Sequence, residues 1–414
     1  MSGKTVWILN HYAVLPEETG GTRHYALARR LAEHGWQCEI IAASYSHWEN
    51  RQRITGSDAC LDRCAGSVRF RFVRTPAYTG NGVSRVVNML CYFLRVLRPR
   101  SVSGLSTPDV IIGSSVHPLA ALAAQRLAVR YGVPFIFEVR DLWPQTLIAM
   151  GRIRGHGITA GVLRALEKYL YRRAARIIVL LPKAGDYIKR YDIPARKLVW
   201  IPNGVDIDSE ASAPANGNPF VITYLGAHGQ ANSLDTILDA VALLGERRLP
   251  VQTVFRFVGE GEQKQRLVRK SIELDLDNVA FENGVPKSRV PAVLSEADAL
   301  IIAVQDLPEL YSYGVSMNKL YDYMASARPV IIAMNAANNP VLEAGAGICV
   351  SPGDPAQLAD AIESLVNMPA EQRARLGENG RQYVEQNHDY DRLADKLAAL
   401  LNDVTVECGI QVSP

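Results

Sequence analysis

The sequence contains no long hydrophobic run. None of its apolar stretches approaches the roughly 20 residues that a membrane-spanning helix needs, and the run at 6–9 has the length of a strand rather than of a secretory leader. The six cysteines are scattered, and Cys60 and Cys64 have no second pair or nearby histidine to complete a zinc site. We therefore expect reduced thiols, no bound metal and a cytoplasmic location.

Acidic residues are absent from residues 63–108, which contain eight arginines. Residues 1–202 carry 29 Lys and Arg against 13 Asp and Glu, a net charge of +16, whereas residues 203–414 carry 16 against 29, a net charge of −13. A basic half of this kind can face nucleic acid, an anionic membrane or an acidic substrate. The arginines do not alternate with stacking aromatic residues, so no nucleic-acid partner is expected.

Residues 83–98 combine apolar side chains at helical spacing with arginines on another face. Val86, Leu90 and Leu97 share the apolar side, and Arg85 and Arg95 share the polar one. One interpretation is an interfacial helix that rests on the anionic inner leaflet. The other is a helix whose apolar side faces the core and whose arginines are solvated.

Short apolar runs alternate with helical patterns along the chain, which is typical of parallel sheets covered on both faces. Two series of strands are expected. They are 5–9, 38–42, 69–74, 110–113, 135–139, 176–180 and 197–201, and then 220–225, 254–259, 279–283, 299–303, 330–333 and 347–350. We therefore predict an α/β fold with two doubly wound, Rossmann-like domains facing across a cleft. Their predicted bounds are 1–202 and 203–385, and the helix at 386–402 is expected to cross back to the first domain.

Residues 314–330 contain the most informative motif. Ser316 and Asn318 stand at a predicted helix start, where unpaired N–H groups and the positive end of the helix dipole favour an anion. Lys319 adds a full charge, and Asp322, one turn further, can accept hydrogen bonds from sugar hydroxyls. The pattern fits a site for a nucleoside diphosphate, or else an ordinary capped helix before a buried strand.

In doubly wound folds, ligands bind beyond the carboxyl ends of the strands, so the strand-end loops are the next candidates. Gly20 and Gly21 allow close approach of the backbone to a phosphate, although a lone glycine pair is a weak signal. His117, before a helix-starting proline, either points into a cleft or is structural. Arg140 and Asp141 form either a structural ion pair or a substrate contact. No Gly-x-Gly-x-x-Gly fingerprint is present, which disfavours a nicotinamide oxidoreductase.

In this order, these motifs resemble glycosyltransferase family 4, the retaining GT-B sugar-nucleotide transferases, and most of all its branch similar to O-antigen and capsule fucosamine transferases. The resemblance covers essentially the whole chain. The motifs that carry it are Gly20-Gly21, His117, Arg140-Asp141-Leu-Trp-Pro, Asn203-Gly-Val-Asp, Gly259-Glu-Gly and Lys319-Leu-Tyr-Asp-Tyr-Met-Ala.

The resemblance implies a role for each motif. The first domain would bind the acceptor and the second the nucleotide sugar. Gly259, Glu260 and Val285 would hold the nucleoside, Asp322 the ribose, and the turn from Ser316 through Asn318 to Lys319 and Leu320 the diphosphate. His117 would contact the donor sugar, and Arg140 and Asp141 would serve the reaction with it. The chemistry would need no metal and no cofactor other than the UDP-sugar substrate.

Two departures from the family pattern concern charge. Members usually carry a Glu eight residues before the ribose carboxylate, where this chain has Gly314, and the ribose residue itself is the shorter Asp322. Many members also have a basic pair in the loop that here is residues 226–233, which contains no Lys or Arg. Lys319, helix dipoles and Arg140 or Arg23 would then neutralise the diphosphate.

The expected activity is a metal-independent, retaining transfer of a hexosyl or N-acetylhexosaminyl group. The donor would be a UDP-sugar, and the acceptor a polyprenyl-diphosphate-linked saccharide of O-antigen or capsule synthesis. The enzyme would be peripheral on the inner face of the cytoplasmic membrane. The alternatives are a GT-B-fold sugar-nucleotide epimerase and a non-catalytic nucleotide-sugar-binding module, the latter because Gly314 replaces the usual Glu.

Overall fold

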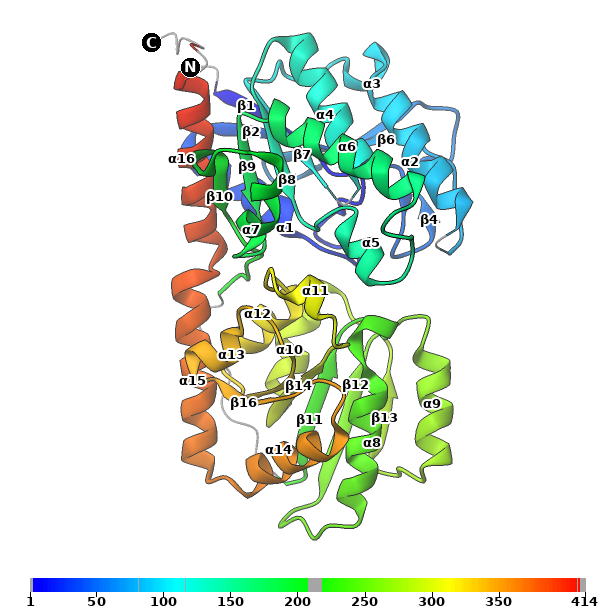
Figure 1. Ribbon diagram of the computed structural model, residues 1–414, viewed down its shortest axis with the longest axis vertical. Helices are drawn as coiled ribbons and strands as arrows, with labels where there is room; N and C mark the ends of the chain where they lie inside the picture. The colour runs from blue at the N-terminus through cyan, green and yellow to red at the C-terminus, as the bar shows by residue number, and fades with distance from the viewer. Residues whose placement is uncertain (1–2, 81, 116, 208–217, 408, 410–414) are drawn as a thin grey trace. The chain divides into compact units, whose positions relative to one another are not determined.

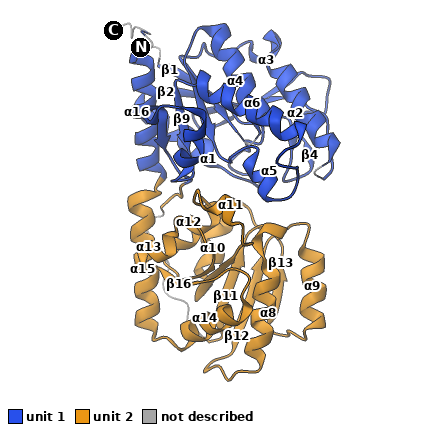
Figure 2. Cartoon of the chain, in the orientation of Figure 1, with its two compact units in different colours: residues 1–203, 390–414 blue, residues 204–389 orange. Residues whose placement is uncertain are grey.

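The computed structural model describes residues 3–80, 82–115, 117–207, 218–407 and 409. The chain divides into two compact units (Figures 1 and 2). The first unit contains residues 1–203 and 390–414, and the second contains residues 204–389. The division therefore falls after Asn203 and again after Asp389.

Unit 1 is built on one sheet with the strand order β10-β9-β8-β7-β1-β2-β6-β5. All neighbouring pairs are parallel except β5 and β6. The strands are β1 (Lys4–Leu9), β2 (Trp36–Ala43), β5 (Cys60–Ala65), β6 (Val68–Val73), β7 (Val110–Ser114), β8 (Phe135–Val139), β9 (Arg176–Val179) and β10 (Leu198–Trp200), and β3 (Tyr45–Ser46) pairs separately with β4 (Arg51–Gln52).

The helices of unit 1 cover both faces of this sheet, which is why its central strands are apolar throughout. They are α1 (Arg23–Leu31), α2 (Val83–Val96), α3 (Pro99–Val102), α4 (Pro118–Tyr131), α5 (Gln145–Ala149), α6 (Ile158–Arg173), α7 (Ala184–Ile188) and α16 (Tyr390–Glu407), with short 3₁₀ turns at Ala32–His34, Lys189–Tyr191 and Ala195–Lys197. Alternate strand residues such as Val6, Ile8 and Ile40 pack with α1 and α16 in one core, and α4 packs against β7 on the opposite face.

Unit 2 has a fully parallel sheet with the order β13-β12-β11-β14-β15-β16. The strands are β11 (Phe220–Leu225), β12 (Thr253–Val258), β13 (Val279–Glu282), β14 (Ala299–Ala303), β15 (Val330–Ala333) and β16 (Gly347–Val350). The helices are α8 (Leu234–Gly245), α9 (Lys264–Glu273), α10 (Val290–Ser295), α11 (Pro308–Tyr311), α12 (Asn318–Ala325), α13 (Pro340–Ala344), α14 (Pro355–Asn367) and α15 (Ala370–Asn387), with 3₁₀ turns at Gln230–Asn232 and Lys287–Arg289. One core lies under α8 and α14 and the other under α10, α12 and α15.

The predicted fold class is confirmed, because both units are doubly wound α/β domains. Every strand of the two expected series is present. The sequence pattern did not indicate β5, since this edge strand is only half-buried and lacks a clear alternation of apolar and polar residues. The last helix continues beyond the predicted end at residue 402 to Glu407, because Val404 packs in the unit 1 core. In the described residues, no helix combines the length and hydropathy that crossing a bilayer requires.

Candidate functional site

The order of the strands places the candidate site of unit 2. Strands β12 and β13 follow β11 on one side of the sheet, and β14 to β16 extend on the other side. The direction of winding therefore reverses between β11 and β14, and ligands of doubly wound sheets bind beyond the strand ends at such a switch point. The loops after these two strands meet there, since the backbone N–H of Gln305 donates to the backbone carbonyl of Ala231 at 3.1 Å.

Lys319 on α12 reaches into this loop. Its ammonium donates to the hydroxyl of Tyr224 at 3.0 Å and to the side-chain oxygen of Asn232, and it lies 4.7 Å from the centre of the Tyr224 ring. Burial lowers the pKa of Lys319 to about 7. Lys319 thus brings a titratable cation to the loop that itself contains no Lys or Arg. The structure supplies neutral partners for this cation, so an anion bound at the loop would stabilise its charge.

Asp322 lies one turn further along α12, where its carboxylate forms an ion pair with the ammonium of Lys287, 2.5 Å away. The Asp322 side chain is 12% exposed. Burial raises the pKa of this carboxyl group; the charge of Lys287 opposes the increase and that of Asp206 adds to it. Lys287 comes from the turn after β13, so the carboxylate predicted to bind ribose is held in position by a second strand-end loop.

The helix start around Ser316 and Asn318 has the form that the sequence predicts, without a side-chain cap. α12 begins at Asn318, and Met317 is the residue before it, with extended backbone. The side-chain oxygen of Asn318 is buried without a hydrogen-bond partner, and Leu320 is fully buried in the core below. Gly314 has a φ of +98°, a conformation that L residues rarely adopt. A Glu would be strained in this backbone conformation, which is a local reason for glycine at this position.

The loops after β11, β12 and β13 are packed together at Gly259. Its φ is +155°, and a Cβ atom there would lie 1.9 Å from the carbonyl oxygen of Gly226, so only glycine fits. Glu260 is exposed, binds the Lys264 ammonium at 2.8 Å and accepts from the amide of Gly284 at 3.3 Å. Val285 follows this last glycine and is half-buried. The loops predicted to hold a nucleoside are therefore neighbours in the structure.

His228 is the buried side chain beside these loops. It is 0% exposed, and neither ring nitrogen has a hydrogen-bond partner. Burial, with a smaller effect from the Lys264 charge, lowers its pKa to about 4, so the ring is neutral near pH 7. Its Nε2 lies 3.2 Å from the position that a Cβ atom on Gly259 would occupy. One unpaired N–H donor and one unpaired acceptor are thus available at the predicted nucleoside site.

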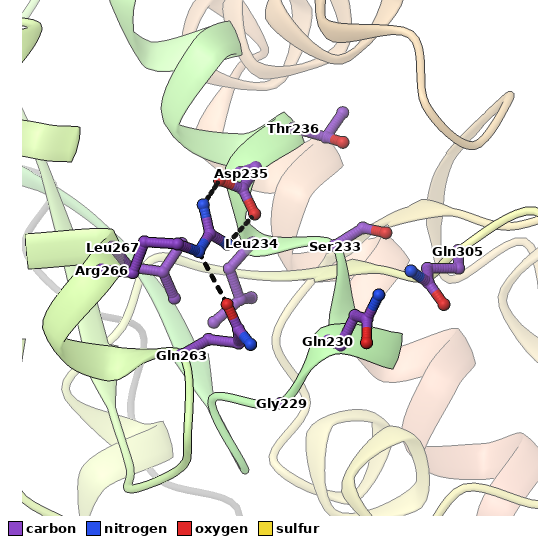
Figure 3. Close-up of a pocket in the computed structure, with 10 residues that line it drawn as sticks. All are labelled: Gly229, Gln230, Ser233, Leu234, Asp235, Thr236, Gln263, Arg266, Leu267 and Gln305. Carbon is purple, nitrogen blue, oxygen red and sulfur yellow. Dashed lines mark hydrogen bonds and ion pairs between the residues drawn. The ribbon is translucent and has the colours of Figure 1, made fainter. Parts of the chain in front are cut away.

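A cavity of about 400 Å³ adjoins the loop that Lys319 contacts (Figure 3). Its walls include Gln230 and Ser233 after β11, Gln305 after β14, and Asp235 at the start of α8. Figure 3 shows Arg266 of α9 bridging to Asp235, with a distance of 2.5 Å between guanidinium and carboxylate. None of the predicted site residues lines this cavity, but Asn232, the partner of Lys319, lies between Gln230 and Ser233 in the same loop.

Unit 1 has its own switch point, between β1 and β7. His117 follows β7 and His11 follows β1, and their ring centres are 4.6 Å apart. Each is 1% exposed, and none of their four ring nitrogens has a hydrogen-bond partner. Burial, and then the charge of Arg85, lowers the pKa of His117 to about 3. His117 is thus at the predicted strand end, as a neutral ring against a second histidine.

The other predicted residues of unit 1 are Gly20, Gly21, Arg140 and Asp141. A Cβ atom on Gly20 would lie 2.7 Å from the Trp48 indole, so this glycine is required by packing; Gly21, which follows it, is half-buried. Arg140 is half-buried and Asp141 exposed, both just after β8. No ion pair within 4.0 Å joins them in the described part of the chain, which leaves the substrate-contact interpretation as a prediction.

Arg23 does not have the role suggested for it. Its guanidinium is buried, lies 3.0 Å from the Glu138 carboxylate and donates to the carbonyls of Ile201 and Pro202. His24 binds the same carboxylate at 2.6 Å. Arg23 is therefore occupied in holding Glu138 and the end of the first segment of unit 1, and it is not available to neutralise a diphosphate in this arrangement.

Three residues with chemistry at these sites were not among the predicted site residues: His11, His228 and Lys287. All three lie within a few residues of a strand end, the position that the sequence analysis used to find His117. Strand-end position alone could therefore have selected them. Their polar contacts, or lack of contacts, depend on side-chain packing that the sequence pattern does not reveal.

Two Rossmann-like units, each with polar strand-end loops at its switch point, have the architecture of the GT-B fold. Family models agree with this assignment. Residues 19–204 match the glycosyl transferase 4-like domain, and residues 206–383 match the glycosyl transferases group 1 domain. The chain therefore belongs to the glycosyltransferases that combine these two domains.

Similarity to curated proteins is low in identity but long in coverage. The chain is 22% identical over 315 residues to a glycosyltransferase of Pseudomonas aeruginosa, WbjE, covering 73% of this chain and 76% of that protein. It is 21% identical over 415 residues to WcaI of Escherichia coli (strain K12), named as a colanic acid biosynthesis glycosyl transferase, covering 94% and 97%.

Solved structures agree with the fold. Sucrose-phosphate synthase from Thermosynechococcus elongatus superposes with a TM-score of 0.74 at 17% identity, covering 98% of this chain and 100% of that one. HepE of Anabaena, solved in complex with UDP-glucose, gives a TM-score of 0.65 at 15% identity, covering 96% and 99%. At these identities the likeness establishes the GT-B fold alone.

Proposed function

We propose that the protein is a retaining glycosyltransferase that moves an N-acetylated hexosamine or deoxyhexosamine from a UDP-sugar to a polyprenyl-diphosphate-linked saccharide in O-antigen or capsule synthesis. The observation that carries the proposal is the arrangement of Lys319, Asp322 and Lys287 at the strand ends of unit 2. The titles of two similar proteins support it: HepE is in complex with UDP-glucose, and WcaI is named for colanic acid synthesis.

The chemistry follows from charge. The bond between the anomeric carbon and the diphosphate breaks, which leaves positive charge on the sugar and negative charge on the leaving phosphate. An acceptor hydroxyl bonds to the anomeric carbon on the same face, and its proton passes to a leaving phosphate oxygen, so no enzymic nucleophile is needed. Lys319 and the first amides of α12 stabilise the departing phosphate, which is the usual route to a large rate effect. In this proposal no metal ion or other cofactor takes part.

The remaining roles are divided between the two units. Asp322 accepts from the ribose hydroxyls, with Lys287 holding its orientation, and Gly259, Glu260 and Val285 accommodate the nucleoside. His117 contacts the donor sugar through one of its unpaired ring nitrogens. Arg140 and Asp141 contact the substrate near the reacting groups.

The test is a panel of nucleotide sugars incubated with and without a lipid-linked acceptor. Transfer that requires the acceptor supports a transferase, isomerisation without acceptor indicates the epimerase, and tight binding without turnover indicates the binding module. Lys319→Ala should lower turnover by roughly 10²–10³, the usual effect of losing one such electrostatic contact. Arg247→Ala is the control, because that cation of unit 2 is paired with Asp360 and Glu363 on α14. Near-wild-type turnover of folded Lys319→Ala would refute the assigned role.

We further propose that α2 rests on the anionic inner leaflet of the cytoplasmic membrane. Five apolar side chains of this helix are exposed at helical spacing, by 44% to 80% of their surface: Val83, Val86, Val87, Leu90 and Leu94. This is the apolar stripe of the helix. A core-facing helix would bury such a row, so its exposure favours the interfacial interpretation.

The basic segment contributes fewer free charges than its composition indicates. Arg69 and Arg71 are paired with Asp62, and Arg95 donates to the backbone carbonyl of Arg74. Arg98 and Arg100 are exposed at the end of α2 and the start of α3. These two arginines, each contributing on the order of 1 kcal/mol near an anionic surface, are the charges that we assign to the membrane face.

Sedimentation with liposomes tests this face. Leu90→Gln with Leu94→Gln should weaken binding to anionic vesicles, and Arg98→Gln with Arg100→Gln should remove most of its salt dependence. The control pair is Ile272→Gln with Leu342→Gln, two apolar residues of unit 2 that are 72% and 69% exposed. Equal binding to neutral and anionic vesicles, or equal loss in the control pair, would contradict the proposal.

A further inference from the structure

The switch point of unit 1 carries a cluster of basic and hydrogen-bonding side chains to which the family models assign no ligand. His11, Tyr12 and His117 pack ring against ring, with centres 4.5 Å apart for His11 and Tyr12. Arg85, from the first turn of α2, donates to the Tyr12 hydroxyl at 2.9 Å and lies 5.1 Å from the centre of that ring. His47 adjoins Tyr12 at 5.6 Å between ring centres. We call these five residues the basic cluster.

Several polar atoms of the cluster are buried without a partner. Both ring nitrogens of His11 and both of His117 are in this state. The side-chain oxygen of Asn88, whose interaction raises the pKa of His11, is also buried without a hydrogen-bond partner. Asn88 cannot turn freely, since its amide nitrogen donates to the carbonyl of Pro76 at 2.6 Å. Unpaired buried polar groups destabilise a fold, so their retention here points to a ligand.

The electrostatics of the cluster favour an anion. Burial, followed by the charges of basic neighbours, lowers the pKa values of His11 and His47. Asn88 opposes the decrease for His11, and no carboxylate is among the groups that raise either pKa. The carboxylate in the adjoining loop, Glu18, is engaged at 2.5 Å by Arg53. Tyr78 fixes the orientation of His47, with 2.9 Å between its hydroxyl and Nδ1. Among the groups that shift the pKa values of His11, His47 and His117, the charged side chains are therefore all basic, which favours an anion over a cation as the ligand.

The apolar stripe of α2 begins in the same turn of helix. Val83 and Val86 are exposed on the outside of α2, while Arg85 between them contacts Tyr12 on the inside. A ligand with a phosphate head and a hydrocarbon tail could place the head in the basic cluster and the tail along the stripe. A free phosphate would use only the first of these two surfaces.

We propose that the basic cluster of unit 1 binds the diphosphate of a prenyl-diphosphate-linked acceptor, and that the apolar stripe of α2 takes the first part of its prenyl chain. The proposal rests on the proposed function for the nature of the acceptor. It adds His11, His47 and Arg85 as binding residues. Because the rings of His117 and His11 meet edge to face, the diphosphate would lie next to the ring predicted to contact the donor sugar.

The experiment measures binding to the full chain by calorimetry, with UDP present at saturation so that the donor site is occupied. The probes are geranyl diphosphate, inorganic diphosphate and geraniol. The proposal expects geranyl diphosphate to bind at least about tenfold more tightly than either of the others, because only it engages both surfaces. Equal affinity for inorganic and geranyl diphosphate would assign the cluster to a free phosphate and overturn the role of the stripe.

Variants locate the binding. Arg85→Gln and His47→Gln should each weaken geranyl diphosphate binding by about 10- to 100-fold, the effect of losing one charge-assisted hydrogen bond. Arg126→Gln is the matched control. Arg126, on α4, is another arginine of unit 1 that lies over a tyrosine ring, that of Tyr169 on α6. Binding that is unchanged in folded Arg85→Gln and His47→Gln, or weakened equally in Arg126→Gln, overturns the proposal. The affinity for UDP is measured for the wild type and for every variant. If the wild type does not bind UDP, the proposed donor site is refuted, and the basic cluster is not.

Discussion

We expect the affinity for UDP to depend on pH through Lys319, and the structure determines whether the affinity rises or falls with pH. The free protein buries this ammonium against Tyr224 and Asn232, and burial lowers its pKa to about 7. A bound diphosphate favours the charged form, so it raises the pKa of Lys319 in the complex. Binding above pH 7 must therefore take up a proton, and the affinity must decrease as the pH rises.

The size of the effect follows from the two protonation states. If only the charged form binds UDP tightly, the dissociation constant increases by roughly 1 + 10^(pH − 7), about elevenfold at pH 8 and about a hundredfold at pH 9, relative to low pH. The limiting slope is about tenfold per pH unit, or about 1.4 kcal/mol. The phosphate of UDP does not interfere in this range, because a terminal phosphate has lost its second proton near a pH of about 6.

Calorimetry of UDP binding at several pH values between 6.5 and 9 provides the measurement, with the proton uptake read from buffers of different ionisation enthalpy. Lys319→Arg keeps its charge throughout and should bind with little pH dependence, whereas Lys319→Gln should bind weakly at every pH. A flat profile in the wild type would refute the reasoning. So would a slope that persists in Lys319→Arg, because the titrating group would then be another residue.

Three other changes test the structure at separate places. Asp322→Asn should weaken UDP binding by about 10- to 100-fold in calorimetry while leaving the apo protein folded, because the ribose loses a charge-assisted acceptor; an equal loss for free inorganic diphosphate would place Asp322 elsewhere. Arg23→Met should lower the free energy of unfolding by about 3–5 kcal/mol in urea, because the buried Glu138 carboxylate loses its charge partner; a change below about 1 kcal/mol would contradict this. Burial raises the pKa of Glu167 to about 7, so its contribution to stability is full below the unfolded-state value near 4.5 and is lost as the pH rises to 7. Urea unfolding should therefore show Glu167→Gln gaining stability relative to the wild type between pH 5 and pH 8, and a constant difference would refute the shift.

The elements and the class of fold could be predicted from the sequence because they depend on local patterns. Apolar runs of strand length, separated by helical periodicity, are sufficient to indicate parallel sheets covered on both faces. The positions of Lys319 and Asp322 followed from the same logic, since a helix start after a glycine turn is a local feature. The edge strand β5 has no such pattern, because none of its residues is fully buried and two of them are exposed.

The partners of the predicted residues could not be obtained in this way. Lys287 is 35 residues from Asp322 in the chain, and Asn232 is 87 residues from Lys319, so each pairing depends on the order of strands in the sheet. The same reason explains the misplaced role of Arg23. The sequence shows an arginine beside a glycine loop. Only the fold shows that the carboxylate of Glu138 lies close enough to form an ion pair with it.

Buried histidines mark both switch points of the chain. His11 and His117 follow strands β1 and β7 in unit 1, and His228 follows β11 in unit 2. Within the described residues, these three rings have both nitrogens buried and without a hydrogen-bond partner. A histidine kept for packing alone would ordinarily find a partner for its N–H, because an unpaired buried donor costs about 1–3 kcal/mol. All three stand where the winding of a sheet reverses, which is where doubly wound folds bind their ligands. Two independent arguments, one from hydrogen bonding and one from topology, therefore select the same loops, and neither uses similarity to any other protein.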